Sequence, residues 1–170
     1  MYSFQFVLWT LEEAVKQYQF AIGVYVLFGH MLLTLHEGGH ALIGALVGVR
    51  STGIRIGAKP SFTITVLGYA IAVGWRPTSG HTTFVDEGNF PDTWQVLVTY
   101  LAGPLSVVCA GPVFFLLFRH SHFHVAAIFG ALFVFCGIYD LRKSCPDGEA
   151  IRRRWKILRS EGFKEAGQID

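Results

Sequence analysis

Charged residues are scarce in this sequence, and cysteines are few. Asp, Glu, Lys and Arg make up 15% of the 170 residues, whereas soluble domains carry about 25%. The three cysteines are an odd number, and Cys109 and Cys136 lie within apolar runs, which excludes a disulfide-stapled secreted module. The net charge of +2 is too small to indicate a nucleic acid partner. Because 52% of the residues are hydrophobic and gather in long runs, the sequence predicts an α-helical integral membrane protein.

Three apolar segments are long enough to cross a bilayer, which takes about 20 apolar residues in a helix. We expect transmembrane helices over residues 22–49, 94–118 and 123–139. The second segment contains Pro104 and Pro112, which a membrane helix tolerates when neighbouring helices satisfy the freed backbone groups. Few residues separate the second and third segments, so these two helices should form a tight antiparallel hairpin.

The N-terminal segment, residues 1–19, lacks the positively charged start of a secretory signal, because its first basic residue is Lys16. Its apolar and polar side chains fall on different faces of a helix. The apolar face consists of Phe4, Val7, Leu8, Leu11, Val15 and Tyr18. This pattern predicts an interfacial helix that lies along the membrane surface.

The segment between the first two spans, residues 51–93, has a different character. β-Branched and polar residues alternate in Phe62–Val66, and glycines and prolines separate such runs. We expect a β-rich insert that forms a small sheet at the membrane surface. The exposed edge of its strands, within residues 54–75, would suit the binding of an extended peptide by β-addition. After the third span, residues 140–170 contain an Asp-Gly pair, where we expect a loop, and a basic tail, where we expect a surface helix.

The basic residues are distributed unevenly between the two sides of the membrane. Of the 14 Lys and Arg residues, three spans place Lys16 and Arg119 on one side and the other 12 on the opposite side. Lys and Arg are enriched in cytosolic segments of membrane proteins. The N-terminus is therefore expected outside, and the sheet and the C-terminal tail in the cytosol.

The first span contains the sequence His36-Glu37-Gly38-Gly39-His40. Two histidines four positions apart lie one turn apart on the same face of a helix, so both rings can bind one Zn²⁺ ion. Glu37 can then act on the water that the metal activates. Ionisable groups inside a membrane span cost about 2.5–3.5 kcal/mol each on insertion scales, which indicates that these three are functional.

A catalytic zinc ion usually has three protein ligands and one open position. The extended metzincin motif is excluded, because Ile43 and Leu46 occupy the positions of its glycine and its histidine. Asp140 and Asp147 are better candidates for the third ligand, because the cytosolic end of the third span can lie beside the cytosolic half of the first. A proline and a glycine flank Asp147, and this turn chemistry favours it. Asp140 stays open as the ligand, or as a residue that supports one.

These motifs resemble the site-2 protease family of intramembrane zinc metalloproteases. The similarity rests on HEGGH in the first span, the strand-rich stretch IRIGAKPSFTITVLGYAIAVGW, YLAGPLSVVCAGP in the second span, and an Asp-Gly pair after the third, and it covers about residues 29–151. The family's last motif usually has an Asn, two spaced prolines and Leu-Asp-Gly. Here it is DLRKSCPDG, one residue shorter, with Asp140 near the Asn position.

The resemblance implies a single membrane-embedded metalloprotease domain over residues 1–170. It implies His36, His40 and Asp147 as ligands of one catalytic Zn²⁺ ion and Glu37 as the general base in peptide-bond hydrolysis. The implied partners are the lipid bilayer and a transmembrane protein substrate.

Two alternatives to a protease remain from the residues alone. His36, Glu37 and His40 could line the ion path of a metal-handling transporter, which discontinuous helices would suit. The chain could instead be an inactive adaptor that binds membrane helices. No internal repeat is visible in the sequence, and an adaptor has no need of Glu37. The protease is therefore favoured.

Overall fold

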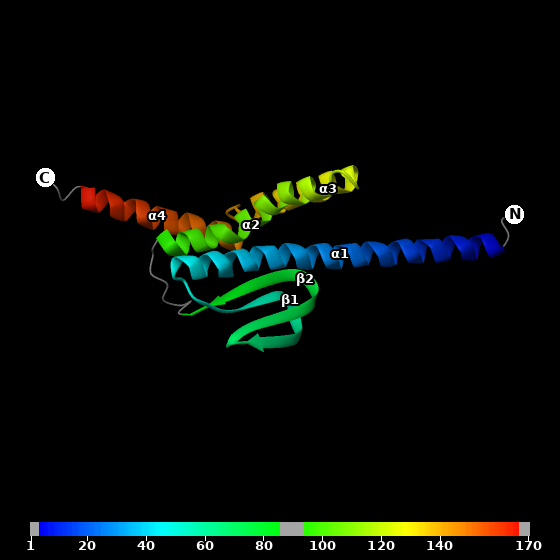
Figure 1. Ribbon diagram of the computed structural model, residues 1–170, viewed down its shortest axis with the longest axis horizontal. Coiled ribbons are helices and arrows are strands. Elements are labelled where there is room, and N and C mark those ends of the chain that lie inside the picture. The colour runs from blue at the N-terminus through cyan, green and yellow to red at the C-terminus, as the bar shows by residue number, and fades with distance from the viewer. Residues whose placement is uncertain (1–3, 86–93, 167–170) are drawn as a thin grey trace.

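The computed structural model describes residues 4–85 and 94–166 (Figure 1). Its elements, in chain order, are α1 (Phe4–Val47), β1 (Ser51–Val66), β2 (Tyr69–Phe84), α2 (Trp94–Phe118), α3 (Phe123–Asp140) and α4 (Pro146–Ala166). Within the described residues, three helical segments are long and apolar enough to cross a membrane: Trp9–Val47, Trp94–Phe118 and Phe123–Asp140. The predicted fold class, three transmembrane helices with a small sheet between the first two, is confirmed. Residues 86–93 of the predicted insert lie outside the described residues.

α1 is one uninterrupted helix of 44 residues. The sequence predicted an interfacial helix over residues 1–19 and a span from residue 22, whereas residues 4–47 form one continuous helix, and residues 1–3 lie outside the described residues. Figure 1 shows that the N-terminal half of this helix extends beyond the other elements. The described part contains neither proline nor glycine before Gly23, so nothing in it interrupts the backbone hydrogen bonds. The helix ends at Val47, because Gly48 adopts a φ of +90° and Val49 N–H donates to Gly44 O at 2.7 Å.

α2 and α3 form the predicted antiparallel hairpin, and small residues bring the two helices close together. A Cβ atom added at Gly111 would lie 2.5 Å from Gly130 O, and one at Gly137 would lie 2.6 Å from Pro104 O. Such small residues allow close backbone approach between membrane helices. Phe133 of α3 is fully buried. The hairpin therefore forms a packed unit against which α1 can dock.

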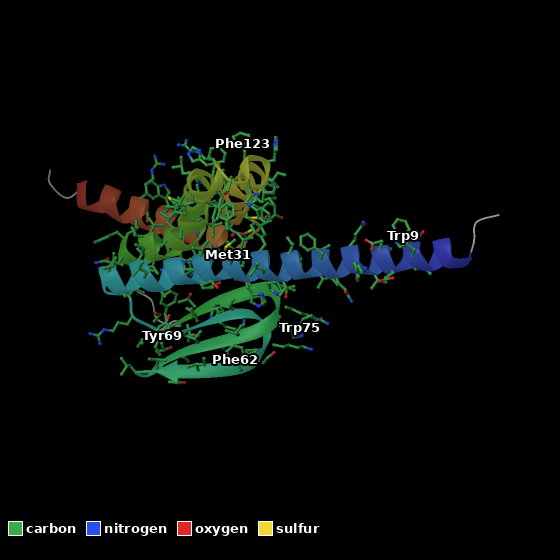
Figure 2. All side chains as sticks on the ribbon, turned by 45° about the vertical axis from the view of Figure 1, so that its right-hand side comes forward. Trp9, Met31, Phe62, Tyr69, Trp75 and Phe123 are labelled. Carbon is green, nitrogen blue, oxygen red and sulfur yellow. The ribbon has the colours of Figure 1, made fainter. Side chains whose placement is uncertain are left out.

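β1 and β2 form an antiparallel hairpin joined by Leu67 and Gly68, which both adopt positive φ. The hairpin curls back on itself. Residues 53–56 of β1 pair with residues 80–83 of β2 on one side and with residues 70–73 of β2 on the other. The predicted strand Phe62–Val66 is thereby placed at the outer edge of the sheet. Figure 2 shows Phe62 on the part of the sheet remote from α1.

The sheet is fixed against α1 by residues of β2. His30 Nε2 lies 2.6 Å from Gly74 O, and a Cβ atom added at Gly29 would lie 2.6 Å from the ring of Pro77. Both figures show the sheet on one side of α1 and the other helices on the opposite side. α1 is therefore the central element of the fold, and its C-terminal half is covered from both sides.

α4 begins earlier than the sequence predicted. The Asp-Gly pair was expected in a loop, but Pro146 opens the helix and Asp147 lies in its first turn. Proline suits the first position of a helix, because its missing N–H would have no helical partner there. The N-terminal end of the helix dipole also favours a carboxylate. α4 packs against α2 and α3 and runs past the end of α1 (Figure 1).

Candidate metal centre

Three side chains that the sequence singled out converge beside α1. His36 Nε2 lies 3.1 Å from His40 Nε2, and Asp147 Oδ2 lies 2.7 Å from the first of these nitrogens and 3.4 Å from the second. A tetrahedral zinc ion with bonds of about 2.0–2.1 Å holds its ligand atoms about 3.3 Å apart. The three atoms thus have nearly the spacing that one zinc ion needs. Among the described residues, these form the one group of three His, Cys, Asp or Glu side chains whose ligand atoms lie close enough to hold one metal ion.

The Nδ1 atom of each histidine ring, which is not the atom in the cluster, contacts an oxygen of another residue. His40 Nδ1 lies 2.7 Å from Thr99 O, to which its N–H can donate, and His36 Nδ1 lies 3.3 Å from Asp140 Oδ2. Histidines that bind metals usually donate their second N–H to a carbonyl or a carboxylate in this way. The structure therefore places Asp140 beside Nδ1 of His36 and Asp147 beside Nε2 of the same ring.

The Asp147 carboxylate, which lies outside the spans, has an electrostatic environment suited to a ligand. Burial raises the pKa of this carboxyl, but the hydrogen-bonding contacts with the His36 and His40 side chains lower it more strongly. The net result is a pKa well below the usual range of an aspartate. Asp147 is therefore ionised at neutral pH, the form that binds metals.

Gly103 and Gly39 allow α2 to approach the histidines closely. A Cβ atom added at Gly103 would overlap the His40 ring, and one at Gly39 would lie 2.6 Å from Ser106 Oγ. Ser106 Oγ also donates to Leu35 O at 2.6 Å and so ties α2 to α1. Sequence reasoning considered the prolines of the second span and gave Gly103 no role of its own. The small-residue pair in YLAGP was the available signal of a close helix contact.

Glu37 is buried between α1 and β2, with 6% of its surface exposed. Thr82 Oγ1 donates a hydrogen bond to Glu37 Oε2 at 2.7 Å. Gly80 lies so close that an added Cβ atom would overlap Glu37 Oε1. Sequence reasoning found neither β2 residue, because no local pattern shows that this strand meets the helix 45 positions earlier.

The cluster opens into a cavity of about 550 Å³. Its walls include the three clustered side chains, Glu37, residues 77–82 of β2, and Tyr100 of α2. Cys145 also lines the cavity, and its Sγ atom contacts Tyr139 O at 3.5 Å. The candidate metal site, the Glu37 carboxylate and a cavity large enough for a peptide segment thus lie next to one another.

A comparison with curated proteins finds no match. A family model described as Peptidase M50B-like matches residues 6–145. The matched region includes the HEGGH sequence of α1, the β-hairpin, α2 and α3, and it ends two residues before Asp147. The match agrees with the resemblance to site-2 proteases, and membership of such a family indicates a metalloprotease. Because it covers well over half of the sequence, the chain belongs to the Peptidase M50B-like family.

Proposed function

We propose that this protein is a zinc-dependent intramembrane endopeptidase that hydrolyses peptide bonds of membrane-spanning protein substrates. The observation that carries the proposal is the convergence of His36 Nε2, His40 Nε2 and Asp147 Oδ2 beside a buried glutamate in an apolar helix. Ionisable groups are costly inside a membrane span, so their presence there indicates a function. The family match supports a metalloprotease, and the ligand spacing supports zinc.

A zinc ion held by these three side chains would supply Lewis-acid chemistry, polarising the scissile carbonyl and lowering the pKa of water to about 7. Glu37 takes a proton from the attacking water and delivers it to the leaving amine. Thr99 O and the Asp140 carboxylate keep the two rings turned with Nε2 toward the site.

The substrate segment is proposed to bind in the 550 Å³ cavity in an extended form. A transmembrane helix hides its carbonyl groups in hydrogen bonds, so it must unwind before water can attack. Residues 77–82 of β2 line this cavity, whereas the strand Phe62–Val66 lies at the outer edge of the sheet. We therefore assign β-addition of the substrate to residues 77–82 rather than to the edge that the sequence favoured.

The proposed orientation has the N-terminus outside and the C-terminus in the cytosol. It rests on the excess of Lys and Arg in the hairpin and in the segment after α3. In this orientation the metal centre lies in the cytosolic half of the membrane. Water and the substrate would then reach the site from the cytosolic side.

The test is the Glu37→Gln variant of the purified protein, reconstituted in lipid vesicles with a model transmembrane peptide. We expect zinc stoichiometry like that of the wild type and loss of cleavage, because the amide cannot accept the water proton. Glu13→Gln, on the exposed N-terminal part of α1, is the matched control and should cleave normally. A Glu37→Gln protein that binds zinc and cleaves at the wild-type rate would refute the proposed function.

A further inference from the structure

The hydroxyl group of Thr82 lies in contact with the proposed general base. Thr82 Oγ1 donates to Glu37 Oε2 at 2.7 Å and lies 3.1 Å from the backbone oxygen of the same residue. Both residues are buried, with 4% of Thr82 and 6% of Glu37 exposed. A hydrogen bond to a charged group in a buried place is about twice as strong as one between neutral groups. This contact therefore has a large influence on where the carboxylate lies.

Gly80 confines the same carboxylate from a second direction. Its backbone is so close to Glu37 that any side chain at position 80 would overlap Oε1. One oxygen is thus hydrogen-bonded to Thr82, and the other lies over Gly80. A glutamate side chain has three rotatable bonds, and these two contacts restrict the orientations that it can adopt.

The position of Thr82 is itself fixed by the docking of the sheet on α1. Two contacts nearer the N-terminus, His30 with Gly74 O and Gly29 with Pro77, hold β2 along the face of α1 that carries Glu37. Residues 80–83 are paired to residues 53–56 on their other side, so the strand has little freedom to move away. The sheet thus presents the threonine hydroxyl to the base.

We propose that Thr82 is a positioning residue, which orients the Glu37 carboxylate for proton transfer. This inference rests on the proposed function, in which Glu37 is the general base. The contacts of the Thr82 hydroxyl are with Glu37, and in this assignment the hydroxyl acts through Glu37, whereas only the backbone of residue 82 belongs to the strand proposed to bind the substrate. A positioned base supplies about 10²–10⁴-fold in rate, and a misplaced base loses part of that factor.

The first experiment measures steady-state cleavage of the model peptide by Thr82→Val, Thr82→Ala and Thr82→Ser in lipid vesicles. We expect Val and Ala to lower kcat by about 10- to 100-fold, a part of the general-base factor, with little change in KM and with full zinc content. Thr82→Ser keeps the hydroxyl and should restore most of kcat. Thr83→Val, an exposed position on the same strand, is the matched control and should behave like the wild type.

Several results of this experiment would overturn the inference. They are wild-type kcat in Thr82→Ala or Thr82→Val, an effect confined to KM, loss of zinc, or a Ser variant as impaired as Ala. If the Val variant fails to fold, the comparison of Ala with Ser decides the question alone.

The second experiment needs neither metal nor activity. In the metal-free protein, the thermal unfolding midpoint is compared for wild type, Thr82→Val, Glu37→Ala and the double variant. Residues in direct contact give non-additive effects in such a cycle. Thr82→Val should therefore lower the midpoint more in the wild-type background than in the Glu37→Ala background. Equal shifts in both backgrounds would remove the basis of the inference.

The two proposals fail in distinguishable ways. If Glu37→Gln keeps full cleavage, the proposed function is wrong, whereas the cycle on the metal-free protein still reports the contact between the two residues. If Glu37→Gln loses cleavage but Thr82→Val and Thr82→Ala keep it, the general base stands and only the positioning role of Thr82 is wrong.

Discussion

Asp147 Oδ2 lies 2.7 Å from His36 Nε2, although the two residues are 111 positions apart in the chain. The contact joins the first turn of α4 to α1. The candidate ligands therefore come together only when α4 is packed in its place against the other helices. A metal ion bound by all three should stabilise this packing, because binding to a site absent from the unfolded chain contributes to folding.

The first prediction distinguishes the two aspartates. Asp147→Ala removes one of the three converging atoms and should abolish stoichiometric zinc binding. Asp140→Ala removes only the carboxylate beside Nδ1 of His36 and should weaken zinc affinity by about 10- to 100-fold, as for other groups that support a ligand. Metal analysis and titration against a competing chelator measure both effects. If Asp140→Ala alone loses the metal, the ligand assignment is wrong, but the proposal of a metalloprotease is unaffected.

The second prediction compares the two glycines inside the HEGGH sequence. A Cβ atom at Gly39 would lie 2.6 Å from Ser106 Oγ and 2.7 Å from Ala102 O, whereas one at Gly38 would meet nothing within 4 Å. Gly39→Ala should push α2 away from α1 and so lower thermal stability and zinc affinity. Gly38→Ala should be neutral or slightly stabilising, because alanine is favoured over glycine in a helix by about 1 kcal/mol.

Thermal unfolding and zinc titration of both variants test this comparison. The two changes are chemically identical and adjacent in the chain, so each is the control for the other. Equal behaviour of the two variants would show that the close contact between α1 and α2 is not needed.

The histidine pair could be predicted from the sequence because its geometry is local. A helix places residues four positions apart on one face, so His36 and His40 follow from their spacing alone. The spans were also predictable, because bilayer thickness sets their length. The sequence favoured Asp147 through its turn chemistry but left Asp140 open, because the choice depends on where α4 begins and how it packs.

The remaining contacts of the site depend on elements that meet only in the folded protein. Thr82 contacts Glu37 because β2 packs on α1, and Gly103 leaves room for the His40 ring because α2 packs against α1. Thr82 has no periodicity or motif that marks it in the sequence, and the small residues of YLAGP indicate a close helix contact without identifying its partner. The continuity of α1 was not predicted, because a surface helix can continue into a span without a break, and no proline or glycine occurs in residues 4–22.

The third prediction concerns the contact between α1 and the sheet. His30→Leu removes the ring whose Nε2 lies 2.6 Å from Gly74 O and whose Nδ1 lies 2.7 Å from Val26 O. It should destabilise the protein by about 1 kcal/mol, the usual net value of a hydrogen bond. Zinc stoichiometry should be unchanged, because the ligands lie on another part of the helix. Cleavage should fall, since the sheet would hold Thr82 less firmly. His124→Leu, at an exposed position in α3, is the control and should change none of these measurements.

The last prediction is the effect of metal removal on stability and activity. Chelation should abolish cleavage of the model peptide, and added zinc should restore it. A ligand that binds only the folded state at 100 times its Kd stabilises that state by about 2.7 kcal/mol, so zinc should raise the thermal midpoint of the wild-type protein. Asp147→Ala should show almost no such rise, because its ligand set is incomplete. A midpoint that responds to zinc equally in both proteins would mean that the metal binds elsewhere, and the convergence of α1 and α4 would then lack the chemical role assigned to it.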